Sequence, residues 1–119
     1  MGSLTMTTLT IDVSDITAAK ERMRAALTGK PQGCRFTFLS EEALLAMLTP
    51  NRWRIVKELT GAGPLGVREL ARRVERDVKG VHTDAQALAK CGLIDRTEDG
   101  KLLLPYDAVR VRMEYRAAA

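Results

Sequence analysis

Apolar residues recur every three or four positions in the second half of the chain, which is the period of an amphipathic helix. This pattern predicts one helix over residues 67–74 and a longer one over 78–90. Asp77 is the expected N-cap of the second helix because its carboxylate can accept hydrogen bonds from the free N–H groups of the first turn. Gly92 is expected to end that helix. The side of the second helix predicted to be buried carries Val78, Val81, Ala85, Leu88 and Ala89.

Two short alternating runs follow the second helix directly. Residues 93–96 and 101–104 flank Glu98-Asp99-Gly100. Asp-Gly between such runs is a strong hairpin signal. With a preceding helix over 50–60, capped by Thr49 and opened by a proline, the order predicts a winged helix-turn-helix domain over residues 40–105.

The 50–60 helix is expected to supply the first helix of a three-helix core. Trp53, Val56 and Leu59 form its predicted buried side. Arg52 and Arg54 lie on the other side, where they either touch a DNA backbone or keep the surface soluble. Both interpretations stay open.

The remaining segments predict an accessory sheet, so the expected fold class is α+β. Strands are expected over 7–13, 35–39 and 109–115, with a helix over 16–28 between the first two. We predict that the strands form one small antiparallel sheet, either an intramolecular cap or part of a dimer interface. In the last strand the residues predicted to point inward are Val109, Val111, Met113 and Tyr115. The chain is thus divided into an extension over 1–39, the winged domain over 40–105 and a C-terminal strand within 106–119.

The outer side of the 78–90 helix carries the candidate chemistry. A recognition helix in the major groove, about 12 Å wide, needs short hydrogen-bonding groups and cations on its free side. Gly80 removes a side chain where the backbone would approach a phosphate. The alternative is that these residues are simply the solvated side of an amphipathic helix. The predicted DNA-binding residues are Lys79, Gly80, His82, Thr83 and Gln86, with Arg68, Arg96 and Lys101 from the neighbouring segments.

The charge distribution favours the same half of the chain. The net charge is +4, and residues 49–105 hold eleven basic and eight acidic side chains. The surplus therefore falls on the predicted winged domain, as an electrostatic footprint for an anionic partner would.

Cysteine and histidine usage gives no sign of a metal or disulfide site. Cys34 and Cys91 are far apart in sequence, and the chain has one histidine. We expect two partly buried thiols in a reduced, cytoplasmic setting, with no metal and no other cofactor. No apolar run reaches the roughly 20 residues of a membrane span, and no secretory signal is expected.

An enzyme is not expected. His82 is the one imidazole, and no serine or cysteine lies near it at a spacing known for nucleophilic catalysis. The carboxylates are scattered rather than clustered as metal ligands. We therefore predict no catalytic residues.

Several short motifs lie in the last two thirds of the chain, outside residues 1–35. The motifs are Ser40-Glu41-Glu42-Ala43-Leu44, Leu48-Thr49-Pro50-x-Arg52, Arg68-Glu69-Leu70-Ala71-Arg72-Arg73-Val74, Arg76-Asp77-Val78-Lys79-x-Val81-His82-x-Asp84, Ala87-Leu88, Gly92-Leu93-Ile94 and Pro105-Tyr106-Asp107. With them the chain resembles a family of bacterial and archaeal winged-helix DNA-binding proteins of the MarR/ArsR-like superfamily.

The resemblance implies a DNA-binding regulator, and some similar proteins are TumA-type antitoxins encoded beside a TumE-type toxin. Such antitoxins repress their own operon and also sequester the toxin. The sequence therefore carries two functional hypotheses. The first is a dimeric, sequence-specific repressor that binds double-stranded DNA. The second is an antitoxin that neutralises a partner toxin by protein–protein contact.

Overall fold

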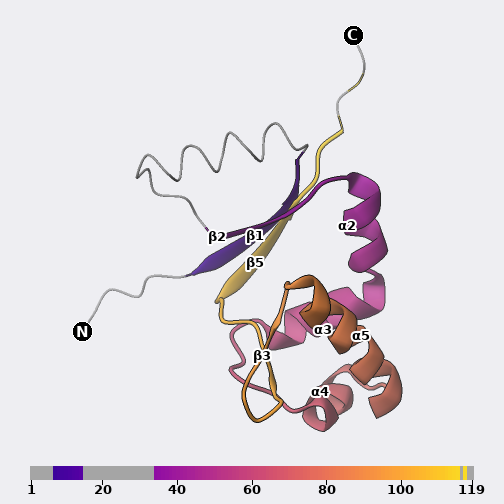
Figure 1. Ribbon diagram of the computed structural model, residues 1–119, viewed down its shortest axis with the longest axis vertical. Helices are drawn as coiled ribbons and strands as arrows, with labels where there is room; N and C mark the ends of the chain where they lie inside the picture. Colours follow the sequence, from indigo (N-terminus) through magenta and orange to yellow (C-terminus); the bar gives the residue numbers. More distant parts are fainter. Residues whose placement is uncertain (1–6, 15–33, 116, 118–119) are drawn as a thin grey trace, which may run out of the picture.

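The computed structural model describes residues 7–14, 34–115 and 117, and within them it contains helices and two small sheets (Figure 1). The predicted helix over 16–28 lies outside the described residues. Mixed α and β structure agrees with the predicted α+β class. In chain order the elements are β1 (Thr8–Val13), β2 (Cys34–Phe38), α2 (Glu41–Met47), α3 (Pro50–Leu59), α4 (Val67–Val74), α5 (Val78–Cys91), β3 (Asp95–Arg96), β4 (Leu102–Leu103) and β5 (Ala108–Arg112).

Helices α3, α4 and α5 pack against one another around an aliphatic core. Leu59, Leu70 and Leu88, one from each helix, are completely buried. Ile55 is also completely buried, whereas Trp53 is only half-buried, so the predicted buried side of α3 was partly wrong. The reason is that α3 contacts both α4 and α5, which requires a wider apolar surface than one stripe.

The helix ends follow the predicted capping residues. The side chain of Thr49 accepts a hydrogen bond from the Arg52 N–H and precedes Pro50 at the start of α3. The carboxylate of Asp77 accepts one from the Gly80 N–H at 3.0 Å. Gly92 ends α5 in the left-handed region, with φ of +94°. These predictions are confirmed, and α4 ends differently, on the non-glycine residue Glu75 with φ of +57°.

The predicted hairpin after α5 is present. Strands β3 and β4 pair antiparallel, with Arg96 opposite Leu102. The turn is closed by the Thr97 N–H, which donates to the Lys101 carbonyl at 2.8 Å, and Gly100 takes φ of +84°. Leu65, between α3 and α4, forms reciprocal backbone hydrogen bonds with Leu102, which joins this hairpin to the helices.

The accessory sheet is parallel, so the predicted antiparallel arrangement was wrong. Its strand order is β2-β1-β5, and β1 runs parallel to both neighbours (Figure 1). A parallel pair requires a crossover connection of a dozen or more residues. Residues 14–33 and 39–107 are long enough for this, and the strand–helix–strand pattern of the first segment was the signal for it.

Burial at the ends of elements also differs from the prediction. Val78 is 42% exposed because it opens α5, where packing partners are fewer than in the middle turns. In β5, Val109 packs on the core and Val111 is exposed. The strand ends at Arg112 instead of residue 115 as predicted, and Met113 and Tyr115 beyond it are also exposed. Cys34 is exposed rather than partly buried, since it begins an edge strand; Cys91 is half-buried as expected.

Candidate nucleic-acid interface

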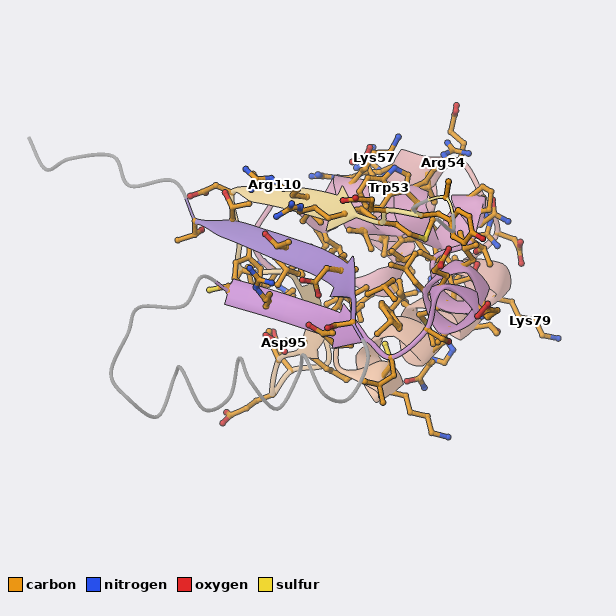
Figure 2. All side chains as sticks on the ribbon, turned by 90° about the horizontal axis from the view of Figure 1, so that it is seen from above. Trp53, Arg54, Lys57, Lys79, Asp95 and Arg110 are labelled. Carbon is orange, nitrogen blue, oxygen red and sulfur yellow. The ribbon has the colours of Figure 1, made fainter. Side chains whose placement is uncertain are left out.

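One side of α5 carries a stripe of exposed polar residues. Lys79, His82, Thr83 and Gln86 occupy positions i, i+3, i+4 and i+7, and all four side chains are exposed. The opposite side is buried through Val81, Ala85 and Leu88. This spacing places the four side chains along a single line on the helix surface. Figure 2 shows Lys79 extending away from the molecule.

A half-buried carboxylate fixes α5 to the rest of the helical core. Asp84 accepts a hydrogen bond from Arg52 Nε at 3.0 Å and one from Arg76 Nη1 at 2.8 Å. Arg52 belongs to α3 and Arg76 to the turn between α4 and α5. The ion triad therefore ties the turn and α3 to the middle of α5, and it holds the polar stripe in a defined orientation.

The pKa of Asp84 reflects this position. Partial burial by itself raises the pKa, but the hydrogen bonds from Arg76 and Arg52 outweigh it and hold the pKa below its ordinary value. Asp84 is therefore ionised at neutral pH, and both guanidinium groups keep a charged partner.

The two arginines of α3 bind within the protein. Arg52 is engaged by Asp84, and Arg54 donates to the Val74 carbonyl, at the end of α4, at 3.1 Å. From the sequence, these arginines were expected either to contact a DNA backbone or to keep the surface soluble, and neither expectation included bonds within the protein. Arg54 satisfies one of the carbonyl groups that a helix C-terminus leaves without an intrahelical partner.

The structure gives Gly80 an internal role. A Cβ placed at Gly80 would lie 3.0 Å from Arg76 Nη2 and 3.0 Å from Asp77 Oδ1. The missing side chain therefore leaves room for the triad arginine and the capping carboxylate. The predicted phosphate approach at this position stays a prediction.

The hairpin contacts α5 through a side-chain hydrogen bond. Arg96 Nη2 in β3 donates to Gln86 Oε1 at 2.6 Å. Arg96 also lines two hollows beside α5. One, of about 490 Å³, lies along Gln86 and Lys90, and the other, of about 200 Å³, is bounded by His82, Val67 and Gly100. The structure thus brings His82, Gln86 and Arg96 together at the junction of helix and hairpin.

The other predicted site residues surround this junction without joining it. Arg68 is exposed in the first turn of α4, next to Val67 of the smaller hollow. Lys101 is exposed in the hairpin, 3.9 Å from the Asp99 carboxylate. Thr83 donates its hydroxyl proton to the Lys79 carbonyl at 3.1 Å, so towards a ligand it offers an acceptor.

Comparison with known proteins identifies a family for this region. The family model described as HVO_A0114 matches residues 47–111. The chain belongs to the HVO_A0114 family. The matched segment runs from the last residue of α2 into β5, so it contains every predicted site residue and excludes β1 and β2. No curated protein and no solved structure matches the chain.

Two features of this HVO_A0114 protein were missed from the sequence. The Asp84 triad had a weak signal, since an acidic residue on a helix between buried and exposed sides favours an internal partner. The Arg96–Gln86 hydrogen bond had no signal in the sequence, because the distance between a helix and a following strand depends on the turn that joins them. Both contacts position the polar stripe rather than extend it.

Proposed function

We propose that this protein is a sequence-specific DNA-binding repressor of the winged helix-turn-helix type, which acts as a dimer. In this proposal α5 enters the major groove of duplex DNA, and the β3–β4 hairpin is the wing that lies against the phosphate backbone. The protein is a binding protein without catalytic activity, and it works in the cytoplasm.

The observation that carries the proposal is the polar stripe on α5. A helix that reads base edges must be held rigidly by its buried side and must present hydrogen-bonding side chains on its exposed side. Val81 and Leu88 are completely buried behind the stripe, and Asp84 anchors the helix through two ion pairs. Arg96 joins the wing to the stripe at Gln86, so helix and wing form one continuous surface.

The proposed roles follow from the chemistry of each side chain. Lys79, Arg68 and Lys101 are exposed cations that neutralise phosphates. Gln86 reads a base edge, and His82 and Thr83 contribute further hydrogen bonds in the groove. Arg96 donates one hydrogen bond to Gln86 and contacts the phosphate backbone of the DNA with its remaining donors.

A titration at two salt concentrations, followed by site selection, tests the proposal. Binding of labelled random duplexes is measured at about 50 mM and about 200 mM salt, because phosphate contacts make the affinity fall steeply between them. Selection from a random pool should then enrich a pseudo-palindrome with half-sites about one helical turn apart, roughly 34–36 Å. Absence of binding at the lower salt concentration, or a pool that stays unenriched, would exclude the proposal.

A second candidate function is neutralisation of a toxin by protein contact. The specific observation in its favour is that three large apolar side chains outside the family segment, those of Leu39, Leu45 and Met113, are exposed. Exposed apolar patches are typical of protein interaction sites. Whether the neighbouring reading frame encodes a small protein that co-purifies with this chain tests the idea. A chain that purifies alone beside an abundantly expressed neighbour would exclude it.

A further inference from the structure

Strand β5 forms an edge of the parallel sheet. The strand order is β2-β1-β5, so among the described residues β5 has a single strand neighbour, β1. Figure 2 shows β5 along one border of the sheet, with Arg110 on it. A strand with one neighbour leaves half of its backbone hydrogen-bonding groups available to another chain.

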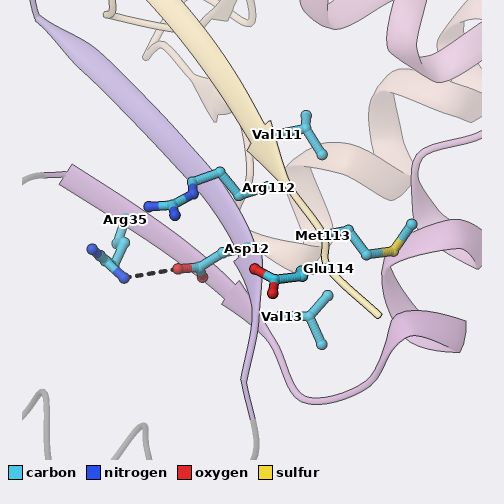
Figure 3. A pocket seen from close by; sticks show the side chains of 7 residues that line it. All are labelled: Asp12, Val13, Arg35, Val111, Arg112, Met113 and Glu114. Atoms are coloured by element: carbon cyan, nitrogen blue, oxygen red, sulfur yellow. Dashed lines mark hydrogen bonds and ion pairs between the residues drawn. The ribbon is translucent and has the colours of Figure 1, made fainter. Parts of the chain in front are cut away.

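The alternating pattern of this segment continues beyond its pairing with β1. The ladder ends where Arg112 lies opposite Asp12, whereas the apolar–polar alternation continues to Tyr115. Figure 3 shows Val111 and Met113 on one side of the segment and Arg112 and Glu114 on the other.

The apolar side chains of this stretch remain uncovered. Val111 is 39% exposed, Met113 44% and Tyr115 83%. Their exposure increases along the segment as it leaves the sheet. A strand-like sequence with an apolar side therefore extends past the point where the protein's own sheet can pair it.

We propose that this segment pairs with the same segment of a second copy of the chain. The two strands run antiparallel about a two-fold axis at Arg112, and the two three-stranded sheets join into one. In this register Arg110 lies opposite Glu114 of the partner subunit. Val111 lies opposite Met113 of the partner subunit, and Val109 lies opposite Tyr115 of the partner subunit.

The balance of charges favours this register over one centred on Val111. The two-fold axis repeats the Arg110–Glu114 pair, so each dimer gains two pairs of opposite charge on one side of the joined sheet. The axis also brings Arg112 opposite Arg112 of the partner subunit, which is one like-charge contact against the two opposite-charge pairs. A shift that centres the pairing on Val111 would instead place Arg110 opposite Arg112 of the partner subunit twice and would lose both opposite-charge pairs. Glu114 already interacts within its own subunit, but a carboxylate has about four acceptor positions and can take a further donor.

The opposite edge of the sheet is less suited to the same role. In β2, Arg35 is bound to Asp12 at 2.8 Å, and the rings of Phe36 and Phe38 pack on each other 5.1 Å apart and on the core. Self-pairing of β2 would bring no opposite charges together. Pairing of β5 with β2 of another copy would be heterologous and open-ended, whereas the two-fold pairing closes as a dimer.

A charge-swap cycle tests this pairing. The measurement is the dimer dissociation constant of the full chain, from sedimentation equilibrium at about 100 mM salt, where charge contacts are still felt over about 10 Å. The variants are Arg110→Glu, Glu114→Arg and the double swap. Arg72→Glu is the control, because it reverses an exposed arginine on α4, away from the sheet.

Each single swap should weaken dimerisation about tenfold or more, because it turns two attractive pairs into two repulsive ones. The double swap should restore the wild-type value to within about threefold, and the control should leave it unchanged. A wild-type chain that is monomeric at high micromolar concentration overturns the pairing, and so does a dimer that tolerates both single swaps. Circular dichroism of each variant checks its fold.

This inference deepens the dimeric part of the proposed function but is separable from it. A dimer that responds to the swaps yet binds no duplex DNA would overturn the proposed function and support the pairing. If the chain binds duplex DNA but the charge swaps do not change its dimer dissociation constant, the proposed function is supported and the strand pairing is overturned.

Discussion

Arg96 and Gln86 are joined by a hydrogen bond of 2.6 Å between the guanidinium group and the side-chain oxygen. This bond takes one of the two acceptor positions of the glutamine oxygen, and the NH₂ group keeps both of its donors for a ligand. In the proposed complex we therefore expect Gln86 to donate to an acceptor on a base edge, such as guanine O6 or thymine O4, because the two-bond contact with adenine would have to share the glutamine oxygen with the Arg96 guanidinium group. The hairpin thus influences which base the helix can read.

Replacement of Gln86 by alanine should reduce both affinity and selectivity. We expect a loss of about 1–3 kcal/mol on the selected site, with relaxed preference at one base-pair position. Fluorescence anisotropy against the selected site and its single-base variants measures both effects. If the variant keeps the wild-type affinity and base preference, this side of α5 does not read the sequence.

Replacement of Lys79 by alanine should act on every duplex alike. Its exposed ammonium group is proposed to neutralise one phosphate, so affinity should fall to a similar extent on selected and random DNA. The slope of log K against log salt should decrease by about one. Lys57→Ala, on the surface of α3, is the matched control and should leave the slope as it is. Equal slopes for wild type and Lys79→Ala would place the phosphate contacts elsewhere.

Removal of the Asp84 carboxylate should destabilise the helical core. Asp84→Ala leaves the half-buried Arg52 and Arg76 without their shared partner, and we expect a loss of about 2 kcal/mol in the free energy of unfolding. Urea denaturation followed by circular dichroism measures it. Glu69→Ala is the control because Glu69 also binds two arginines, but on the exposed surface of α4, where such pairs contribute little. Equal losses in the two variants would contradict a special role for Asp84.

The Asp84 contribution should also depend on pH in a defined direction. Because the folded pKa is lowered, the unfolded chain binds the proton more tightly, and stability rises with pH in the interval between the two pKa values. The advantage of wild type over Asp84→Asn should therefore be complete above the unfolded pKa of about 3.9 and disappear as the pH falls through the lower folded value. Paired urea titrations from neutral pH into this acidic range measure the difference. A difference that grows on acidification would contradict the ion triad.

Replacement of Glu75 by glycine should stabilise the protein. Glu75 ends α4 in the left-handed region with φ of +57°, a conformation that costs a side chain roughly 1–2 kcal/mol. Glycine removes this strain but increases the entropy of the unfolded chain, so we expect a net gain of about 0.5–1 kcal/mol. Thermal and urea denaturation measure it. Gly92→Ala is the reverse control at the end of α5, and it should destabilise because φ is +94° there. A loss of stability in Glu75→Gly would mean that the side chain makes a contact stronger than the strain.

The ends of the helices and the hairpin were predictable because each depends on residues close in sequence. Thr49 and Asp77 cap helices through N–H groups three residues ahead, and Gly92 supplies the left-handed residue after α5. The Asp99-Gly100 turn closes on residues within the hairpin itself. The buried side of α5 followed from helical periodicity for the same reason, except at Val78, where the helix begins.

The sequence by itself determined where the helices α3 and α5 begin and end, that a hairpin follows α5, and which polar residues of α5 are exposed, since capping and periodicity act over a few residues. Only the tertiary structure decided that β1 runs parallel to β2 and β5, that Asp84 binds Arg52 and Arg76, and that Arg96 reaches Gln86. Strand direction depends on the path of long connections, and a contact between side chains of different elements depends on how those elements pack.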